Sequence, residues 1–413
     1  MMRNFIYALM AVVMTIFTSC SSNDDVTRNY VLTVNALLPE ETVMSEISKA
    51  TVTVTNTSTG RSFQKDNVAA TYEFVVPAGV YDIQVALGSN NGTETYALNG
   101  AKLGENVFAD SAVDVALVKG TVSGLVFKEV YYNMVKPNGK MPYMADQFME
   151  IYNNSDEVLY LDNCIIGILE GTQGTQPSVW VGSDGQLMDK YPLAYYTIAF
   201  VGDGTKYPVQ PGKSVVIASQ AQDHTQITTE MYDPENPDAK ISPVNLTNAN
   251  YEVCLTDYKP DKAIDNQSVP NMDIIFNSGT QNYFMVPYTG NAVILAKLPV
   301  DPYAFATDKS NLMAKPESIA TTEYLMIPQE YVLDGINIVN NADKLNQQVI
   351  RLRPEVDGGK VFNNAAYCGL SIRRKVESIN ANGRAVLKDT NNSSEDFLTN
   401  QVPTPGVIPT TVD

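Results

Sequence analysis

The stretch that decides the fold is QFMEIYNNSDEVLYLD, residues 147–162. Phe148, Glu150 and Tyr152 alternate with Met149 and Ile151, which predicts a strand with two different faces. The polar run at 153–157 has turn composition, and apolar residues resume at 158–161. The pattern therefore predicts a β-hairpin, in which Glu150 alone would be a candidate catalytic carboxylate.

The chain begins like an exported lipoprotein. Arg3 precedes an apolar run at 5–17, and the small residues Thr18 and Ser19 precede Cys20. This arrangement predicts a secretory signal peptide over residues 1–19, too short to span a bilayer as a finished helix. A cysteine at this point predicts that Cys20 is acylated, for example with palmitate, and becomes the first mature residue. An ordinary cleaved signal with an incidental cysteine is the alternative.

Residues 20–29 are polar and predict a tether between the lipid and the first domain. Within it SSNDD, residues 21–25, resembles the acidic tag that lipoproteins of Bacteroidota carry for display on the outer leaflet. A solvated linker is the alternative reading of the same residues. We therefore expect a chain anchored in the outer membrane by lipid and exposed at the cell surface.

The charge balance is acidic, with 46 acidic residues against 28 basic ones and a net charge of −18 at pH 7. Such a surface repels nucleic acid and anionic membranes, so neither is an expected ligand. Besides Cys20 the chain has Cys164, Cys254 and Cys368, which allow at most one disulfide and leave open whether any forms. No CxxC motif or Cys/His cluster predicts zinc.

Residues 30–119 predict a small β-sandwich with a core of its own. Tyr72, Phe74 and Val76 share one strand face, and Pro77-Ala78-Gly79 turns the chain into a second alternating strand at 81–87. The stretch YEFVVPAGVYDIQVALG resembles the penultimate hairpin of carboxypeptidase-regulatory, transthyretin-like domains. That resemblance implies a spacer or stalk without catalytic activity of its own.

Residues 120–413 carry phrases of a second domain. Glu150, Asn153 and Ser155 have the spacing of an E-hydrophobic-x-N-x-S strand, and a Pro-Gly turn follows at 211–212. The closing phrases are SIRRK (371–375), DTNNS (389–393), Asp396-Phe397 and PTPG (403–406). In this order the phrases resemble the lamin-tail domain, an immunoglobulin-like β-sandwich. The resemblance implies that Glu150 belongs to a structural framework, with Asn153 and Ser155 capping its turn.

The signal with Cys20, the transthyretin-like module and the lamin-tail-like domain together resemble an uncharacterised Bacteroidota lipoprotein family, domain of unknown function 4876. The resemblance covers nearly the whole mature chain and implies no activity. The expected fold class is mainly β, with two immunoglobulin-like or transthyretin-like β-sandwich domains in tandem. The second domain is enlarged by an insertion at 220–370.

This insertion has the least clear pattern. Residues 283–288 and 292–298 predict strands, whereas the apolar spacing at 319–327 and 330–345 predicts short helices. Long insertions between strands are more often functional loops than structureless ones, so we expect a ligand-facing surface here.

Catalytic groups are scarce. His224 is the chain's one histidine, and its polar loop predicts a solvated surface residue. The sequence has no Gly-x-Ser-x-Gly elbow and no phosphate-binding glycine loop. A carboxylate pair hydrolyses glycosides without histidine, but among 46 acidic residues some pair falls near the required separation by chance. We therefore expect no enzyme.

A structural calcium ion is the one cofactor that the sequence suggests. Asp257, Asp261 and Asp265 have a loop-like spacing that suits oxygen coordination, as does the acidic group at 233–238. Neither group fits the EF-hand pattern, and solvated loops are the alternative.

Aromatic side chains provide the candidate ligand-binding residues. Trp180 lies in a Gly-rich loop and is either an exposed carbohydrate platform or a buried anchor for that loop. Tyr195 and Tyr196 should point to opposite faces of their strand, so at most one of them, taken as Tyr196, joins Trp180.

The expected function is that of a non-catalytic binding or docking accessory on the cell surface, associated with an outer-membrane nutrient-uptake system. Its partners would be the membrane, through the N-terminal lipid, and an outer-membrane transporter or another surface protein. The alternatives are an adhesin or fimbria-like subunit and a carboxylate-dependent, glycan-active enzyme.

Overall fold

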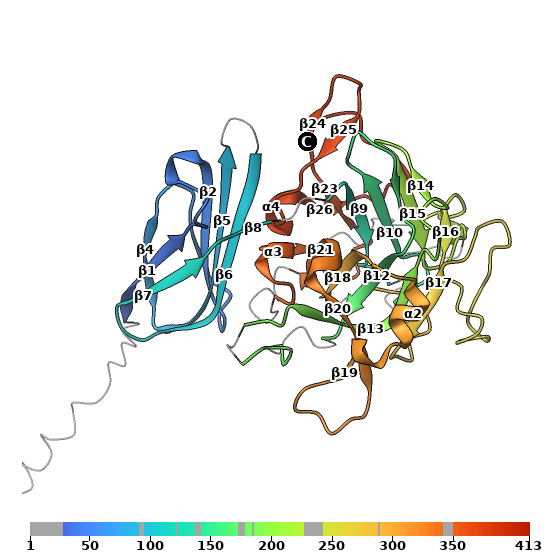
Figure 1. Cartoon of the computed structure of the whole chain (residues 1–413), viewed down its shortest axis with the longest axis horizontal. Helices are drawn as coiled ribbons and strands as arrows, with labels where there is room; N and C mark the ends of the chain where they lie inside the picture. Colours follow the sequence, from blue (N-terminus) through green and yellow to red (C-terminus); the bar gives the residue numbers. More distant parts are fainter. Residues whose placement is uncertain are drawn as a thin grey trace, which may run out of the picture.

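The computed structural model describes residues 28–90, 95–120, 123–136, 142–171, 178–183, 186–226, 243–287, 290–341 and 350–413. These residues form two layered β-sandwiches, which lie side by side in Figure 1. The mainly β fold class predicted from the sequence is confirmed. Cys20 and the acidic group at 233–238 fall outside the described residues. Within them, no helix combines the length and apolarity that crossing a bilayer requires.

The first sandwich packs a three-stranded sheet on a five-stranded one. The first sheet has the order β4 (Thr71–Pro77), β1 (Asn29–Leu37), β7 (Ser111–Ala116), and the second has β3 (Ser62–Lys65), β2 (Ile47–Asn56), β5 (Gly79–Asn90), β6 (Thr95–Val107), β8 (Val118–Lys119), with η1 (Met44–Glu46) before β2. Alternate side chains such as Leu32, Phe74 and Ile83 meet in one core. Because β4 and β5 belong to different sheets, the Pro77–Gly79 turn crosses the sandwich and does not close the predicted hairpin.

The second sandwich packs a six-stranded sheet on an eight-stranded one. The smaller sheet has the order β16 (Tyr251–Glu252), β15 (Ser214–Ala218), β10 (Phe148–Asn153), β9 (Leu125–Tyr131), β23 (Ser371–Arg374), β26 (Phe397–Gln401). The larger has β19 (Leu312–Ala314), β20 (Glu323–Pro328), β13 (Lys190–Ala199), β12 (Cys164–Leu169), β18 (Gly290–Lys297), β21 (Val332–Asn341), β22 (Val361–Asn363), and β17 (Asp273–Asn277) pairs with β13. Two short pairs are β11 (Leu159–Tyr160) with β14 (Pro208–Val209) and β24 (Val376–Ile379) with β25 (Ala385–Leu387).

Apolar side chains fill the space between these two sheets, with Phe127 and Ile151 from the smaller sheet meeting Ile166 and Ile336 from the larger. The outer face of the larger sheet is covered by short helices. They are α2 (Pro302–Thr307), η3 (Lys309–Asn311), η4 (Gln329–Tyr331) and α3 (Pro354–Asp357), while η2 (His224–Gln226) and α4 (Ser393–Asp396) lie elsewhere in this sandwich. Both faces of the larger sheet are therefore buried.

The 220–370 segment supplies strands β17 to β22 of the larger sheet and the edge strand β16 of the smaller one. The helices predicted at 319–327 and 330–345 are wrong, because β20 and β21 occupy those positions. In β21 alternate residues, Ile336 and Ile338, enter the central core, which is the period of a strand. The strand predicted at 292–298 is confirmed as β18, whereas residues 283–287 form no strand.

The 147–162 stretch also differs from the predicted hairpin. Strand β10 pairs with β9 and β15, while β11 pairs with β14, so the two halves lie in different sheets. The turn between them is held by Asn153, whose amide nitrogen donates to Glu157 O and Val209 O, each at 2.7 Å. Asn153 Oδ1 accepts from Ser155 N at 3.0 Å and Ser155 Oγ at 2.7 Å, which confirms the predicted capping roles.

Glu150 is fully buried within the smaller sheet. Its Oε2 lies 2.7 Å from Lys128 Nζ, and Glu129 Oε2 lies 3.8 Å from the same nitrogen. The two carboxylates also accept from the closing phrase, Glu129 from Thr404 N at 3.1 Å and Glu150 from Gly406 N at 3.1 Å. One buried cation therefore holds two carboxylates, which in turn fasten the C-terminal segment.

We expect Glu150→Ala to lower the free energy of unfolding by about 3–5 kcal/mol, because it leaves the Lys128 ammonium buried beside a single, more distant carboxylate. The measurement is urea unfolding followed by the fluorescence of Trp180, the chain's one tryptophan. Glu157→Ala, an exposed site in the adjoining turn, is the matched control. Equal midpoints for both variants would contradict a structural role for Glu150.

Candidate functional site

Trp180 does not form the predicted carbohydrate platform, because its side chain is buried at 3 % exposure. The indole Nε1–H donates to Glu170 Oε2 at 2.9 Å, and the ring meets Tyr324 edge-on with centroids 5.5 Å apart. Lys315 Nζ binds the other oxygen of Glu170 at 2.9 Å. The tryptophan is therefore a buried anchor for its loop, which is the alternative weighed from the sequence.

Tyr196 is buried as well, at 1 % exposure, and its hydroxyl donates to Gln281 O at 2.8 Å. The expectation that Tyr195 and Tyr196 face opposite sides is wrong, since both belong to the core between the sheets. Tyr195 has a φ of 62°, and this left-handed residue interrupts the alternation of β13 at a register shift. A bulge of this kind leaves no signal in the alternation of the sequence.

The three aspartates of the predicted calcium site are exposed on the loop after β16. Asp265 accepts from Gln267 Nε2 and from Asn271 Nδ2, the latter at 3.2 Å, so its own loop engages it. Among the residues that the structure describes, no three His, Cys, Asp or Glu side chains are grouped as a metal ion would require. Asp257, Asp261 and Asp265 therefore do not form the predicted site. Cys164, Cys254 and Cys368 form no disulfide among the described residues.

His224 is not the solvated residue that its sequence context predicts, because the side chain is fully buried. Its Nε2 lies 2.8 Å from Gln220 O and its Nδ1 2.8 Å from the Tyr143 hydroxyl. A carbonyl only accepts, so Nε2 carries the proton and Nδ1 accepts from Tyr143. Burial lowers the pKa of His224. Both nitrogens are engaged, which leaves neither of them available as a general base.

The most highly charged buried group surrounds Arg374 on β23. Its Nη2 lies 2.6 Å from Asp334 Oδ2, and its Nη1 lies 3.1 Å from Asp389 Oδ1 and 3.6 Å from Asp396 Oδ2. Arg374 Nε donates to Phe127 O at 2.9 Å. Burial raises the pKa of Asp389 and Asp396 to about 6, although the Arg374 guanidinium opposes this shift. One cation thus serves three carboxylates.

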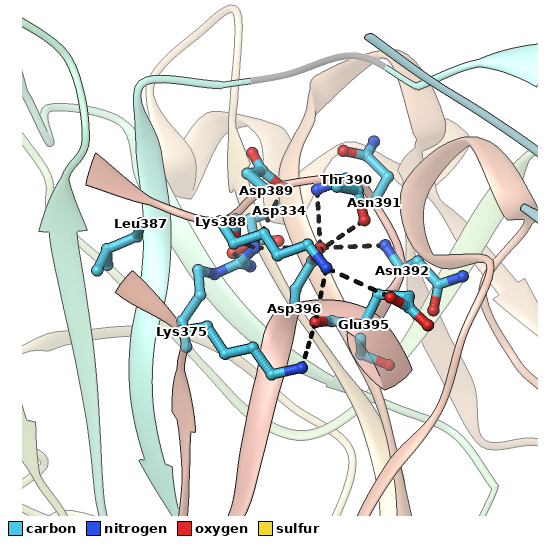
Figure 2. A network of polar contacts seen from close by, with 12 residues as sticks. Asp334, Lys375, Leu387, Lys388, Asp389, Thr390, Asn391, Asn392, Glu395 and Asp396 are labelled. Carbon is cyan, nitrogen blue, oxygen red and sulfur yellow. Dashed lines mark hydrogen bonds and ion pairs between the residues drawn. The ribbon is translucent and has the colours of Figure 1, made fainter. Parts of the chain in front are cut away.

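The turn at 389–396 closes around these carboxylates (Figure 2). Asp396 accepts from Thr390 N at 2.8 Å, from Thr390 Oγ1 at 2.7 Å and from Asn392 N at 3.2 Å. Lys375 Nζ and Lys388 Nζ both donate to Glu395 O, at 2.7 and 3.0 Å. The turn is therefore rigid and polar at the same time.

This turn is also the joint between the two sandwiches, where α3 and α4 face β6 in Figure 1. The buried Asn99 on β6 donates through Nδ2 to Thr390 O at 2.9 Å and to Asn391 O at 3.1 Å. Gln84 Nε2 donates to Gly358 O at 2.6 Å, and Lys49 pairs with Glu395 at 2.9 Å. Hydrogen bonds to backbone carbonyls therefore set the relative position of the sandwiches.

An open cleft of about 560 Å³ lies between α2 and α3 on the outer side of the larger sheet. Its walls come from the start of β13, from η3 and η4, from the start of β21 and from Asn391. Asp334 lines this cleft and also pairs with Arg374, so the buried charged cluster adjoins the cleft. The volume lies in the range of small-ligand sites. This cleft is the candidate functional site.

The sequence predicts a ligand-facing surface in the 220–370 segment, but none of its predicted site residues lines this cleft. Its carboxylates are Asp189 just before β13, Glu330 in η4, Asp334 in β21 and Glu355 in α3. Residues so far apart in the chain share no spacing, and only the pairing of β13 with β20 and of β18 with β21 brings them together.

Comparisons with known proteins agree with this architecture. The chain is a protein of tandem β-sandwiches, and residues 210–404 match the sequence profile of the family described as "Protein of unknown function (DUF4876)". It is similar to the crystal structure of a DUF4876 family protein from Bacteroides thetaiotaomicron VPI-5482, at 26 % identity and a TM-score of 0.57. That similarity covers 93 % of this chain and 99 % of the other. No curated protein matches the chain.

A buried carboxyl in the second sandwich, Asp146, makes the stability of the chain depend on pH. Asp146 is fully buried, its Oδ2 accepts from the Tyr131 hydroxyl at 3.2 Å, and its Oδ1 has no partner among the described residues. Burial raises the pKa of Asp146 to about 7. The folded chain therefore keeps this proton up to about pH 7, whereas the unfolded chain releases it near its ordinary value of 3.8.

The stability that Asp146 contributes is accordingly fully present below about pH 4. It is lost between about pH 4 and pH 7, by about 1.4 kcal/mol per pH unit, and the slope ends above the folded pKa. We expect Asp146→Asn, which stays neutral, to remove this part of the dependence. Urea unfolding between pH 5 and pH 8, as order-of-magnitude limits around the titration, measures the slope. Asp261→Asn, an exposed site, is the control. An unchanged slope for Asp146→Asn would overturn the assignment.

Proposed function

We propose that this chain is a lipid-anchored binding or docking protein of the outer membrane, exposed at the cell surface and without catalytic activity. The first sandwich would be a transthyretin-like stalk and the second a lamin-tail-like binding module, associated with an outer-membrane uptake system. The observation that carries the proposal is Cys20, which directly follows small residues and an apolar run at 5–17. The similar protein from Bacteroides supports the bacterial group in which such anchors are expected.

Two features of the structure support this proposal, one for the non-catalytic role and one for the stalk. Both nitrogens of the one histidine are hydrogen-bonded inside the protein, so a histidine-dependent hydrolase lacks its base. The joint at Asn99 and Gln84 fixes the second sandwich on the first, as a stalk that presents a binding module would require.

The fimbria-like alternative has less support. Exchange of strands between subunits needs a segment that leaves its own sheet readily. Here the C-terminal segment after β26 is held by the buried carboxylates of Glu129 and Glu150, through Thr404 and Gly406. Removing that segment would leave both carboxylates short of donors in the interior.

Cell fractionation tests the anchor. We expect Cys20→Ala to move the protein from the outer-membrane fraction to the soluble fraction, because the acyl chains are lost. Ser21→Ala, which keeps the acylated cysteine, is the matched control. Protease added to intact cells should degrade the wild-type chain. A Cys20→Ala protein that still sediments with the outer membrane would refute lipid anchoring, and resistance in intact but not lysed cells would refute surface exposure.

A further inference from the structure

We propose that the cleft between α2 and α3 binds a neutral oligosaccharide, an inference that deepens the proposed function and rests on it. The cleft combines three kinds of wall: carboxylates, amides and aromatic rings. Sugars present hydroxyl groups that both donate and accept, together with apolar C–H faces. A cleft with that mixture is complementary to them.

Glu355 supplies the acceptor in this cleft. Its Oε2 is covered by surrounding atoms and makes no hydrogen bond within the described residues, while its Oε1 lies 4.0 Å from Arg353 Nε. The backbone is fixed by Pro354 at the first position of α3 and by Asn391 Nδ2, which donates to Glu355 O at 2.7 Å. A covered carboxylate oxygen without a donor is costly, and rotation of the partly exposed carboxyl group toward a ligand hydroxyl in the cleft would satisfy it.

Tyr331 supplies an apolar wall. It lies at the end of η4, and its ring meets that of the buried Phe305 edge-on with centroids 6.2 Å apart. Its neighbour Gln329 is held by the Tyr191 hydroxyl, which donates to Oε1 at 3.0 Å. Aromatic faces fixed in this way pack against apolar surface at little entropic cost.

The charges favour a neutral ligand. Asp189, Glu330 and Glu355 face the cleft against Lys190, and Asp334 is already paired with Arg374. Anionic ligands are therefore repelled. An ammonium group only donates hydrogen bonds, so it could not accept from the side-chain N–H groups of an amide such as that of Gln329. Hydroxyl groups match both the carboxylates and the amides.

Binding by the full-length lipoprotein tests this inference, in a detergent that has no sugar headgroup. The probes are maltohexaose, cellohexaose, laminarihexaose, mannohexaose and xylohexaose, with a polygalacturonate oligomer and spermine as charged probes. We expect at least one neutral probe to bind with a Kd of about 1 mM or tighter by calorimetry. The charged probes should not compete.

Glu355→Ala and Tyr331→Ala should each weaken that binding at least about tenfold. Glu355→Ala should unfold like the wild type, because Glu355 Oε2 makes no hydrogen bond among the described residues and Oε1 lies 4.0 Å from Arg353 Nε. Tyr331→Ala removes a ring that packs on Phe305, so its unfolding midpoint is measured too, and its binding is compared below that midpoint. Glu377→Ala, an exposed carboxylate on β24, is the matched control and should bind normally.

Three outcomes would overturn the inference: no neutral probe binds, spermine binds in their place, or both cleft variants bind as tightly as the control. None of these would affect the proposed anchor, which fractionation tests separately. Cleavage of a bound probe, lost in Glu355→Ala, would confirm the ligand class but refute the non-catalytic role.

Discussion

The buried guanidinium of Arg374 is the interaction on which the second sandwich depends. It lies on β23 of the smaller sheet, donates to Phe127 O on β9 and pairs with Asp334 on β21 of the larger sheet. It also pairs with Asp389 of the closing turn and lies 4.7 Å from the centre of the Phe397 ring. A guanidinium carries five N–H donors in a fixed planar fork, against three on a lysine ammonium, so it can satisfy several partners at once. Removing it would leave carboxylates buried without a counter-charge, and this costs more than the pair itself contributes.

In a second buried group, on the neighbouring strand β9, the Lys128 ammonium likewise neutralises more than one buried carboxylate. The two groups explain why certain phrases stand out in the sequence. Glu150 and Gly406 of the PTPG phrase meet at Lys128, whereas Arg374 of SIRRK meets Asp389 of DTNNS. The recognisable residues are thus those that neutralise buried charge, and buried charges tolerate few substitutes.

Burial also explains which parts of the structure can be predicted from the sequence. Strands with one exposed face alternate visibly, and the capping of the turn by Asn153 follows from local chemistry. The 330–345 region was misread as helical because β21 is buried on both faces, so its sequence lacks clean alternation. Tyr196 was misplaced because the left-handed Tyr195 shifts the register, and Trp180 was ambiguous because its partner Glu170 lies ten positions away. Alternation encodes none of these three features: burial on both faces of a strand, a left-handed residue inside a strand, and a contact between side chains of separate segments.

The turn at 389–396 belongs both to the cleft and to the joint between the sandwiches. It therefore connects the candidate ligand site physically with the contacts that orient the two sandwiches. The backbone carbonyl of Asn391 accepts from Asn99 of the first sandwich at 3.1 Å, while its side-chain amide donates to Glu355 O at 2.7 Å. The position of the cleft carboxylate therefore depends on the same residue that accepts from Asn99 of the first sandwich. Asp396 and Arg374 hold this turn, since Asp396 accepts from Thr390 N at 2.8 Å and lies 3.6 Å from Arg374 Nη1. A ligand that pulls Glu355 toward itself would therefore act on the contact between the two sandwiches through Asn391, with no other residue between.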